Sequence, residues 1–348
     1  MTQPEIFYPA KTDHIYHMTD DTGMLQHSCY SVPNLSRGYS SDDNARALIM
    51  AVLLDEQKPT LQTAQLIHRY LAFMFHVQNE DGTFRNFMEF SRTFTEKVGS
   101  GDNLGRSLWG LGFAWAQSQV PDNMKKAILD CITPAIPHCA NLEYPRSRAY
   151  AILGLSYLET EDAKAMLILL ADALADQYEQ NSDGSWHWFE DTITYCNSIL
   201  PRALLRAYQK TGILRYRQIA LESLDFLETK TFRDGYFKPI GCKGWLKKNG
   251  TPAEYDEQPV EAGETTLAYL DAYEITGEKR YYQKAVRTFA WYYGMNSRNQ
   301  SMIDPDTGGC YDGICEDGLN LNQGAESLVS YWIACLSIQK YPDNIIFH

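Results

Sequence analysis

Six stretches of this sequence begin with polar residues and continue into helical segments rich in small side chains. They are marked by Asp43, Asn103, Ser147, Ser198, Gly263 and Gly324, at intervals of 60, 44, 51, 65 and 61 residues. Each interval has room for two helices and two connections, and such a period is typical of a repeat architecture. Six inner helices alternating with outer ones predict an all-α (α/α)6 toroid, closed by a short N-terminal helix near residues 12–18.

The spacing of apolar residues supports this architecture. Helical periodicity is long and frequent, whereas alternating apolar runs are short and stand next to Gly or Pro. No linker or composition shift marks a boundary, so we expect residues 1–348 to form a single domain. The expected helices span about residues 43–54, 61–78, 103–117, 122–138, 149–158, 162–180, 199–208, 214–229, 260–275, 279–295 and 324–338.

The most informative helix start is the stretch Ser40–Leu48. Ser41 or Asp42 can serve as its N-cap, and Asp42 and Asp43 fall in the first turn, where the helix dipole favours negative charge. Taken alone, the stretch is a good helix start. A similar Asp-Asn followed by Arg recurs at Asp102, Asn103 and Arg106, which points to more than capping.

The inner helices of a toroid run parallel, so their N-termini meet at one mouth. Aspartate-glycine turns in the connections would place Phe84, Trp186, Trp188, Tyr236 and Tyr311 on the same rim. Polar groups that converge between aromatic walls are typical of a ligand cleft. The residues expected to bind substrate there are Arg46, Asp102, Asn103, Arg106, Tyr144, Arg146, Arg148, Trp186, His187, Trp188, Asn197, Glu257, Gln258, Gln323 and Glu326.

Composition excludes several kinds of partner. The formal net charge is −13 and the basic residues are dispersed, which disfavours a nucleic-acid partner. The N-terminus lacks the features of a signal peptide, and no run of about 18 apolar residues exists, so we expect a cytoplasmic protein without a membrane partner. The eight cysteines include no C-x-x-C pair, and no Cys/His cluster accompanies His14 and His17, so we expect reduced thiols, no cofactor and no transition-metal site. A calcium ion held by loop carboxylates stays open as an alternative.

Several short motifs resemble a known superfamily. They are Leu25-Gln26-His27, Tyr30-Ser31-Val32-Pro33, Gly38-Tyr39, Asp42-Asp43-Asn44-Ala45-Arg46 and Trp188-Phe189-Glu190-Asp191. Together with the repeat they resemble six-hairpin (α/α)6-barrel glycosidases, and in particular bacterial proteins that stand alone or are fused behind a GT-B-type glycosyltransferase domain. The resemblance implies carbohydrate metabolism and a possible glycosyltransferase partner.

Glycoside hydrolysis needs two carboxyl groups, one protonated and one ionised, on either side of the scissile bond. Asp42 and Asp43 are adjacent, and like charges that lie close together raise one pKa. We therefore predict Asp43 as the acid and Glu261 as the base, and these two roles could be exchanged. Glu190 is the next candidate for the base, and Asp42 is the catalytic neighbour that raises the pKa of Asp43. Asp191 and Glu257 are further candidates for the opposing carboxylate. Inversion is expected by analogy with the fold.

Three alternatives stay open at this stage. The arginines can pair with the acids or can bind an anion, which would be phosphate in a phosphorylase, or a uronate or sugar phosphate as substrate. An epimerase or isomerase would use paired histidines, for which only His27 and His187 are candidates. A non-catalytic glycan-binding partner of a glycosyltransferase would hold sugar without opposed carboxylates. The substrate is otherwise expected to be an oligosaccharide.

Overall fold

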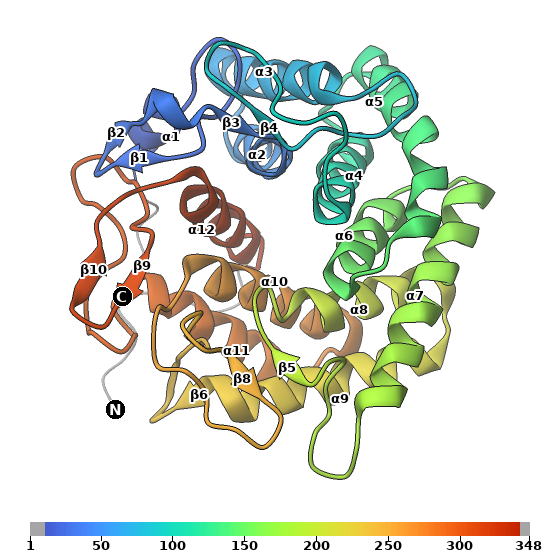
Figure 1. Cartoon of the computed structure of the whole chain (residues 1–348), viewed down its shortest axis with the longest axis vertical. Helices are drawn as coiled ribbons and strands as arrows, with labels where there is room; N and C mark the ends of the chain where they lie inside the picture. Colours follow the sequence, from blue (N-terminus) through green and yellow to red (C-terminus); the bar gives the residue numbers. More distant parts are fainter. Residues whose placement is uncertain (1–10, 342–348) are drawn as a thin grey trace.

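In a computed structural model that describes residues 11–341, the helices form two concentric rings (Figure 1). Each inner helix packs against the next, and the last packs against the first, which closes the ring. The (α/α)6 toroid is confirmed. The inner helices are α2 (Ser41–Gln57), α4 (Gly101–Ala116), α6 (Pro145–Ser156), α8 (Ile199–Thr211), α10 (Pro259–Thr276) and α12 (Ala325–Ile338). The outer helices are α3 (Leu61–Val77), α5 (Asp122–Ala135), α7 (Glu161–Asn181), α9 (Leu214–Thr231) and α11 (Lys279–Phe289).

The helix ends follow local chemistry. Ser40, rather than Ser41 or Asp42, caps α2, because its side chain accepts a hydrogen bond from the backbone N–H of Asp43. Ser100 caps α4 in the same way. The ranges expected to end near residues 138 and 295 overrun α5 and α11, because the 3-10 helices η2 (Ile136–Asn141) and η3 (Ala290–Tyr292) continue these helices.

The N-terminal helix α1 (Asp13–His17) is shorter than an outer helix. The backbone N–H of His14 donates to Thr307 O at 3.0 Å, and His14 Nε2 lies 2.8 Å from Gln323 O. The helix is therefore tied to the connection that precedes α12. Closure of the ring rests on the direct packing of α12 against α2.

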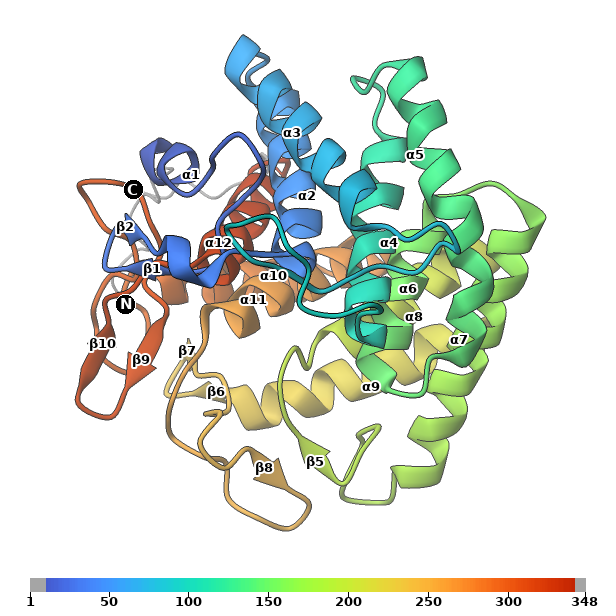
Figure 2. The same cartoon turned by 45° about the horizontal axis from the view of Figure 1, so that its top comes forward.

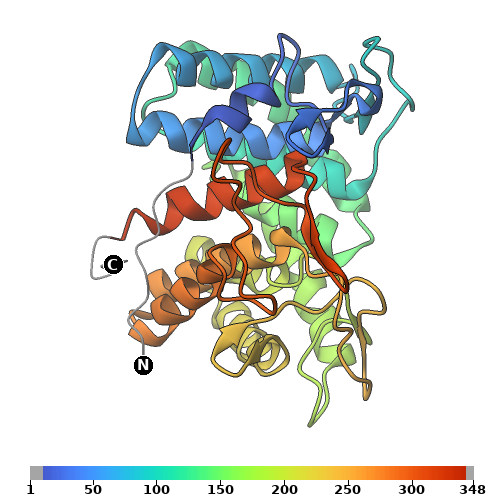
Figure 3. The same cartoon turned by 90° about the vertical axis from the view of Figure 1, so that its left-hand side faces the viewer.

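The long connections gather on one side of the toroid, at the N-termini of the inner helices (Figures 2 and 3). They carry short antiparallel strands and the 3-10 helix η1 (Leu35–Arg37). The described strands are β1 (Ser28–Cys29) with β2 (Val32–Pro33), β3 (Tyr39–Ser40) with β4 (Phe87–Met88), β5 (Thr192–Ile193) with β8 (Leu246–Lys247), β6 (Phe232–Arg233) with β7 (Tyr236–Phe237), and β9 (Gly313–Cys315) with β10 (Gly318–Asn320).

The apolar core lies between the two rings and includes whole faces of the inner helices. None of the helices within residues 11–341 is both long and apolar enough to cross a membrane.

Two glycines set the distance between neighbouring inner helices α4 and α6. A Cβ on Gly112 would lie 2.4 Å from Gly154 O, and a Cβ on Gly154 would lie 2.4 Å from the Leu108 carbonyl. No side chain fits between these backbones, so the small residues seen in the sequence allow the ring to close tightly.

This packing predicts that Gly154→Ala lowers stability by about 1–3 kcal/mol, because overpacking forces α4 and α6 apart. Thermal unfolding followed by circular dichroism measures the effect. Gly184→Ala is the matched control, since no heavy atom lies within 4 Å of the added Cβ. Equal melting temperatures for the two variants would contradict the close-packing argument.

Candidate active site

A cavity of about 380 Å³ opens at the mouth between the N-termini of α2, α4 and α12. Its charged wall combines the carboxyl groups of Asp42, Asp43, Asp102, Asp312 and Glu326 with the guanidinium of Arg46. The remaining lining residues are Gln26, His27, Ser40, Asn86, Phe87, Ser100, Asn103, Gln258, Asn320, Gly324 and Ser327. The mouth therefore concentrates acidic groups on one side of the ring.

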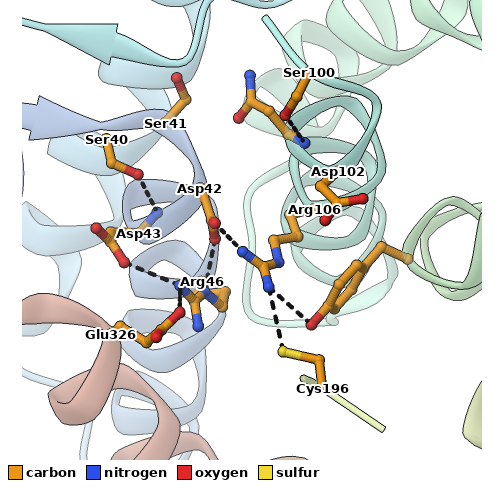
Figure 4. A network of polar contacts seen from close by, with 12 residues as sticks. Ser40, Ser41, Asp42, Asp43, Arg46, Ser100, Asp102, Arg106, Cys196 and Glu326 are labelled. Carbon is orange, nitrogen blue, oxygen red and sulfur yellow. Dashed lines mark hydrogen bonds and ion pairs between the residues drawn. The ribbon is translucent and has the colours of Figure 1, made fainter. Parts of the chain in front are cut away.

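Asp42 lies between two arginines (Figure 4). Arg46 Nε is 2.9 Å from Asp42 Oδ1, and Arg106 Nη1 donates to Asp42 Oδ2. Burial by itself raises the pKa of this carboxyl, but the charges of Arg106 and Arg46 outweigh that effect and hold the pKa below its usual value. Asp42 is therefore ionised at neutral pH and neutralises part of both cations.

The neighbouring Asp43 has the opposite character. Its carboxyl is 4% exposed and accepts a hydrogen bond from Arg46 Nη2 at 3.0 Å. Burial raises the pKa of Asp43 to about 7; Arg46 opposes this rise, while the charges of Asp42 and Glu326 add to it. Two adjacent residues in the first turn of one helix thus differ in protonation near neutral pH.

Glu326 reaches the same guanidinium from α12. Arg46 Nη2 donates to Glu326 Oε2 at 3.1 Å, and the glutamate side chain remains 44% exposed. Because this nitrogen also binds Asp43 Oδ1, the two bonded carboxyl oxygens lie no more than about 6 Å apart, which is below the separation of about 6.5–9.5 Å typical of inverting glycosidases. A buried carboxyl with a raised pKa and an exposed carboxyl therefore face one cavity.

A second hollow of about 460 Å³ adjoins the first, and both are lined by Gln258 and Glu326. Its other walls are Arg106, Tyr195, Cys196, Cys242, Trp245 and Val260. Glu326 thus stands at the junction of the two cavities.

The structure brings part of the predicted set together. The predicted residues that line one or both cavities are Asp42, Asp43, Arg46, Asp102, Asn103, Arg106, Gln258 and Glu326. They come from α2, α4, α12 and the residue before α10.

Glu261, predicted as the base, lines neither cavity. Its 4% exposed carboxylate accepts hydrogen bonds from the backbone N–H groups of Cys196 and Asn197 and from Asn197 Nδ2 at 3.0 Å. Burial raises the pKa of Glu261 to about 7, against these hydrogen bonds. The group holds the start of α8 in place, and we withdraw it as the base.

Glu190, Arg146 and Asn197 form a similar internal network. Arg146 Nη1 donates to Glu190 Oε2 at 2.7 Å, and Arg146 Nη2 to Asn197 Oδ1 at 3.4 Å. None of the three lines a cavity. The structure therefore does not bring Glu190, Arg146 and Asn197 into the lining of either cavity, where their predicted roles would place them.

Four more predicted ligands are placed elsewhere. Glu257 is fully buried and accepts hydrogen bonds from Trp291 Nε1 and Ser297 Oγ. Gln323 Nε2 donates to Asp304 at 2.7 Å. Arg148 binds Leu142 O and Gln177, and Tyr144 is 69% exposed on the surface. These side chains are outside both sets of lining residues.

The aromatic residues of the aspartate-glycine turns pack inward instead of lining the cleft. Trp188 is fully buried, and Trp186 is 4% exposed and stacks edge-on against Phe226. His187 Nδ1 lies 3.1 Å from Glu222, on the outer helix α9. Phe84, Tyr236 and Tyr311 also line neither cavity.

The sequence reasoning missed several lining residues. Phe87 and Trp245 supply the exposed aromatic surface that was assigned to the turns, and Asp312 and Asn320 come from the β9–β10 hairpin. The motif Leu25-Gln26-His27 places Gln26 and His27 in the wall, although the sequence predicted a role for His27 only in the epimerase alternative. The motif precedes the first inner helix in the sequence, and this position could have predicted that it lies at the mouth.

Among solved structures, the chain resembles a sugar epimerase from a ruminal bacterium, with 12% identity, a TM-score of 0.74 and coverage of 94% of this chain and 95% of the other. The cellobiose 2-epimerase of Bacillus thermoamylovorans is 13% identical, with a TM-score of 0.73 and coverage of 95% of this chain and 96% of the other. The GH76 α-mannanase of Bacteroides thetaiotaomicron is 13% identical, with a TM-score of 0.63 and coverage of 87% of this chain and 86% of the other. These likenesses show the (α/α)6 fold of the chain. No protein-family model matches the sequence, and no curated protein does.

The displaced pKa of Asp43 predicts a stability effect. The unfolded state loses this proton near pH 4, whereas the folded state keeps it to about pH 7, so stability falls as pH rises between these values. Asp43→Asn has no proton to retain, so its stability does not fall in this way. The stability of this variant minus that of the parent should therefore increase by about 1.4 kcal/mol per pH unit between pH 5 and 7.

Chemical denaturation at several pH values measures this difference. The exposed Glu80→Gln serves as control. A stability difference between Asp43→Asn and the parent that does not vary with pH would rule out the raised pKa.

Proposed function

We propose that this protein is a glycoside hydrolase that cleaves an oligosaccharide, with Asp43 as the general acid and Glu326 as the opposing carboxyl group. The observation that carries the proposal is the pair itself. The pKa of Asp43 is raised to about 7, Glu326 is exposed, and both are held by the same nitrogen of Arg46 at the cavity wall.

The chemistry follows from the two environments. Asp43 donates its proton to the oxygen of the scissile bond, because burial keeps that proton bound near neutral pH. Glu326 supplies the opposing carboxyl group, and Arg46 fixes the two carboxyl groups relative to each other. The limit of about 6 Å is closer to the separation of about 5–5.5 Å in retaining enzymes than to that in inverting ones, so we propose retention in place of the inversion expected by analogy with the fold. Glu326 would then be the nucleophile that binds the sugar, and water would hydrolyse this intermediate with Asp43 as the base.

The arginines favour water over phosphate as the acceptor. Arg46 pairs with Asp42, Asp43 and Glu326, and Arg106 pairs with Asp42. The cavity wall holds more carboxyl groups than guanidinium groups, so an entering phosphate would meet repulsion. A neutral sugar fits better than a sugar phosphate or a uronate.

The lining of the first cavity supports a sugar ligand. Its carboxyl and amide groups can bind sugar hydroxyls, which both donate and accept hydrogen bonds. Phe87, which is 43% exposed, adds an apolar wall.

An epimerase or isomerase is the second candidate, because His27 and Asp312 line the same cavity and solved neighbours include sugar epimerases. Only one of the two candidate histidines lies there, since His187 pairs with Glu222. A glycan-binding partner of a glycosyltransferase is the third candidate. It would bind sugar without turnover.

Activity variants test the assignment on gluco- and manno-oligosaccharides, with and without phosphate, by mass spectrometry and NMR. Asp43→Asn and Glu326→Gln should each lower kcat by about 100-fold or more, while Glu261→Gln should change it by less than about tenfold, because Glu261 does not face the cavity. Loss of activity in Glu261→Gln alone would restore the first assignment of the base.

The products separate the candidates. Cleavage without phosphate supports hydrolysis, and cleavage that requires phosphate overturns it in favour of a phosphorylase. Conversion of one sugar into another without cleavage assigns an epimerase. Saturable binding without any turnover, unchanged in Asp43→Asn, assigns the glycan-binding role.

The pH profile is a separate prediction. Because the acid must be protonated, kcat/KM should fall as pH rises through about 7, the pKa of Asp43 in the folded protein. Initial rates between pH 5 and 9 measure this. A basic limb that persists with the same midpoint in the residual activity of Asp43→Asn would assign the proton to another group.

A further inference from the structure

We propose that the second hollow is a sugar subsite that holds the neighbour of the sugar in the first cavity, with Trp245 as its stacking platform and Tyr195 as its side wall. The inference rests on the proposed function only in taking a sugar chain as the occupant. It assigns that chain a path across the mouth.

The path follows from Glu326. This residue and Gln258 line both cavities. If the bond that reacts lies at Glu326, one sugar occupies the first cavity and its neighbour occupies the second. The volumes of about 380 and 460 Å³ leave room for at least one sugar ring on each side.

Tyr195 is held rigidly at this junction. Its hydroxyl donates to Asp102 Oδ2 at 2.7 Å, and Asp102 lines the first cavity. The guanidinium of Arg146 lies 4.6 Å from the Tyr195 ring centroid, and Arg146 Nε donates to Tyr195 O. A wall fixed before binding adds little ordering cost when a ligand enters.

Trp245 is brought to Tyr195 by strand pairing. Ile193 of β5 pairs with Leu246 of β8, which joins the connection carrying Tyr195 to the one carrying Trp245. The two ring centroids are 6.5 Å apart and the ring planes meet at 48°. They therefore form a corner that is open to the cavity.

The backbone at Trp245 supports a ligand role. Its φ is +58°, a left-handed conformation that non-glycine residues seldom adopt. Such strain costs on the order of 1–3 kcal/mol and is concentrated at ligand-binding positions. Its backbone is fixed on both sides by hydrogen bonds, from Trp245 N to Gly241 O and from Ala253 N to Trp245 O.

The chemistry of the hollow fits a neutral sugar ring. The aromatic corner can contact the apolar face of the ring, while Arg106, Gln258 and Glu326 face its hydroxyl groups. Burial raises the pKa of Cys196 to about 12, so this thiol stays neutral and does not make the hollow a thiolate site.

The test uses the Asp43→Asn protein, so that binding is measured without turnover. Glucose, mannose, cellobiose and mannobiose are titrated by calorimetry and by ligand-observed NMR. Trp245→Ala should lower the disaccharide affinity by about tenfold, the upper range for one aromatic contact. It should also remove the advantage of disaccharide over monosaccharide. Trp245→Phe keeps a flat ring and should restore most of the affinity.

Phe75→Ala is the matched control, because Phe75 is 38% exposed on the outer helix α3, away from both cavities. If Trp245→Ala binds the disaccharide as tightly as Phe75→Ala does, the subsite is overturned. It is also overturned if Trp245→Phe loses as much disaccharide affinity as Trp245→Ala. Failure of every sugar to bind overturns it as well.

The outcome is independent of the hydrolase assignment. Binding that depends on Trp245, in a protein whose unmutated form cleaves nothing, keeps the subsite and rejects hydrolysis. If the unmutated protein cleaves the sugar but the disaccharide affinity is unchanged in Trp245→Ala, hydrolysis is kept and the subsite is rejected.

Discussion

The ion-pair network around Arg46 joins the closure of the ring to the chemistry of its mouth. Arg46 lies in α2, the first inner helix, and its guanidinium reaches Glu326 in α12, the last one. It also binds Asp42 and Asp43 in its own helix. With only 2% of its side chain exposed, this cation depends on these carboxylates for its charge to be tolerated. The contact between the first and last inner helices is therefore also the place where opposed carboxyl groups are held.

The same network explains how adjacent aspartates acquire different protonation. Asp42 receives two guanidinium groups, from Arg46 and Arg106, and stays ionised. Asp43 is buried and shares Arg46 with two other carboxylates, so the cation only partly offsets its burial. Burial raises the pKa of Asp43, and the unequal division of two cations among three carboxyl groups leaves this rise only partly offset.

Much of this could be predicted from the sequence. The repeated polar helix starts defined six inner helices and, through their parallel arrangement, one mouth. The structure has Asp43, Arg46 and Arg106 at this mouth, because residues of the first two turns lie at that end of each helix. The sequence does not give the rotation of each helix about its own axis. Glu261 and Glu326 are both glutamates in a first turn, yet Glu261 faces the start of α8 and Glu326 faces the cavity. The position of Trp245 at the mouth depends on the pairing of β5 with β8, which belong to two distant connections. Each strand has only two residues, so no alternating pattern in the sequence predicted this pairing.

The mouth is chemically divided. On the α6, α8 and α10 side, first-turn polar groups satisfy one another, as in the bonds of Arg146 to Glu190 and of Asn197 to Glu261. On the α2, α4 and α12 side, the polar groups at the helix starts line the cavity, as Asp42, Asn103 and Glu326 do. A ligand that enters the mouth therefore meets its polar groups on this side. Helix capping alone would have left all six starts alike, and the difference between the two halves supports a binding site at the mouth.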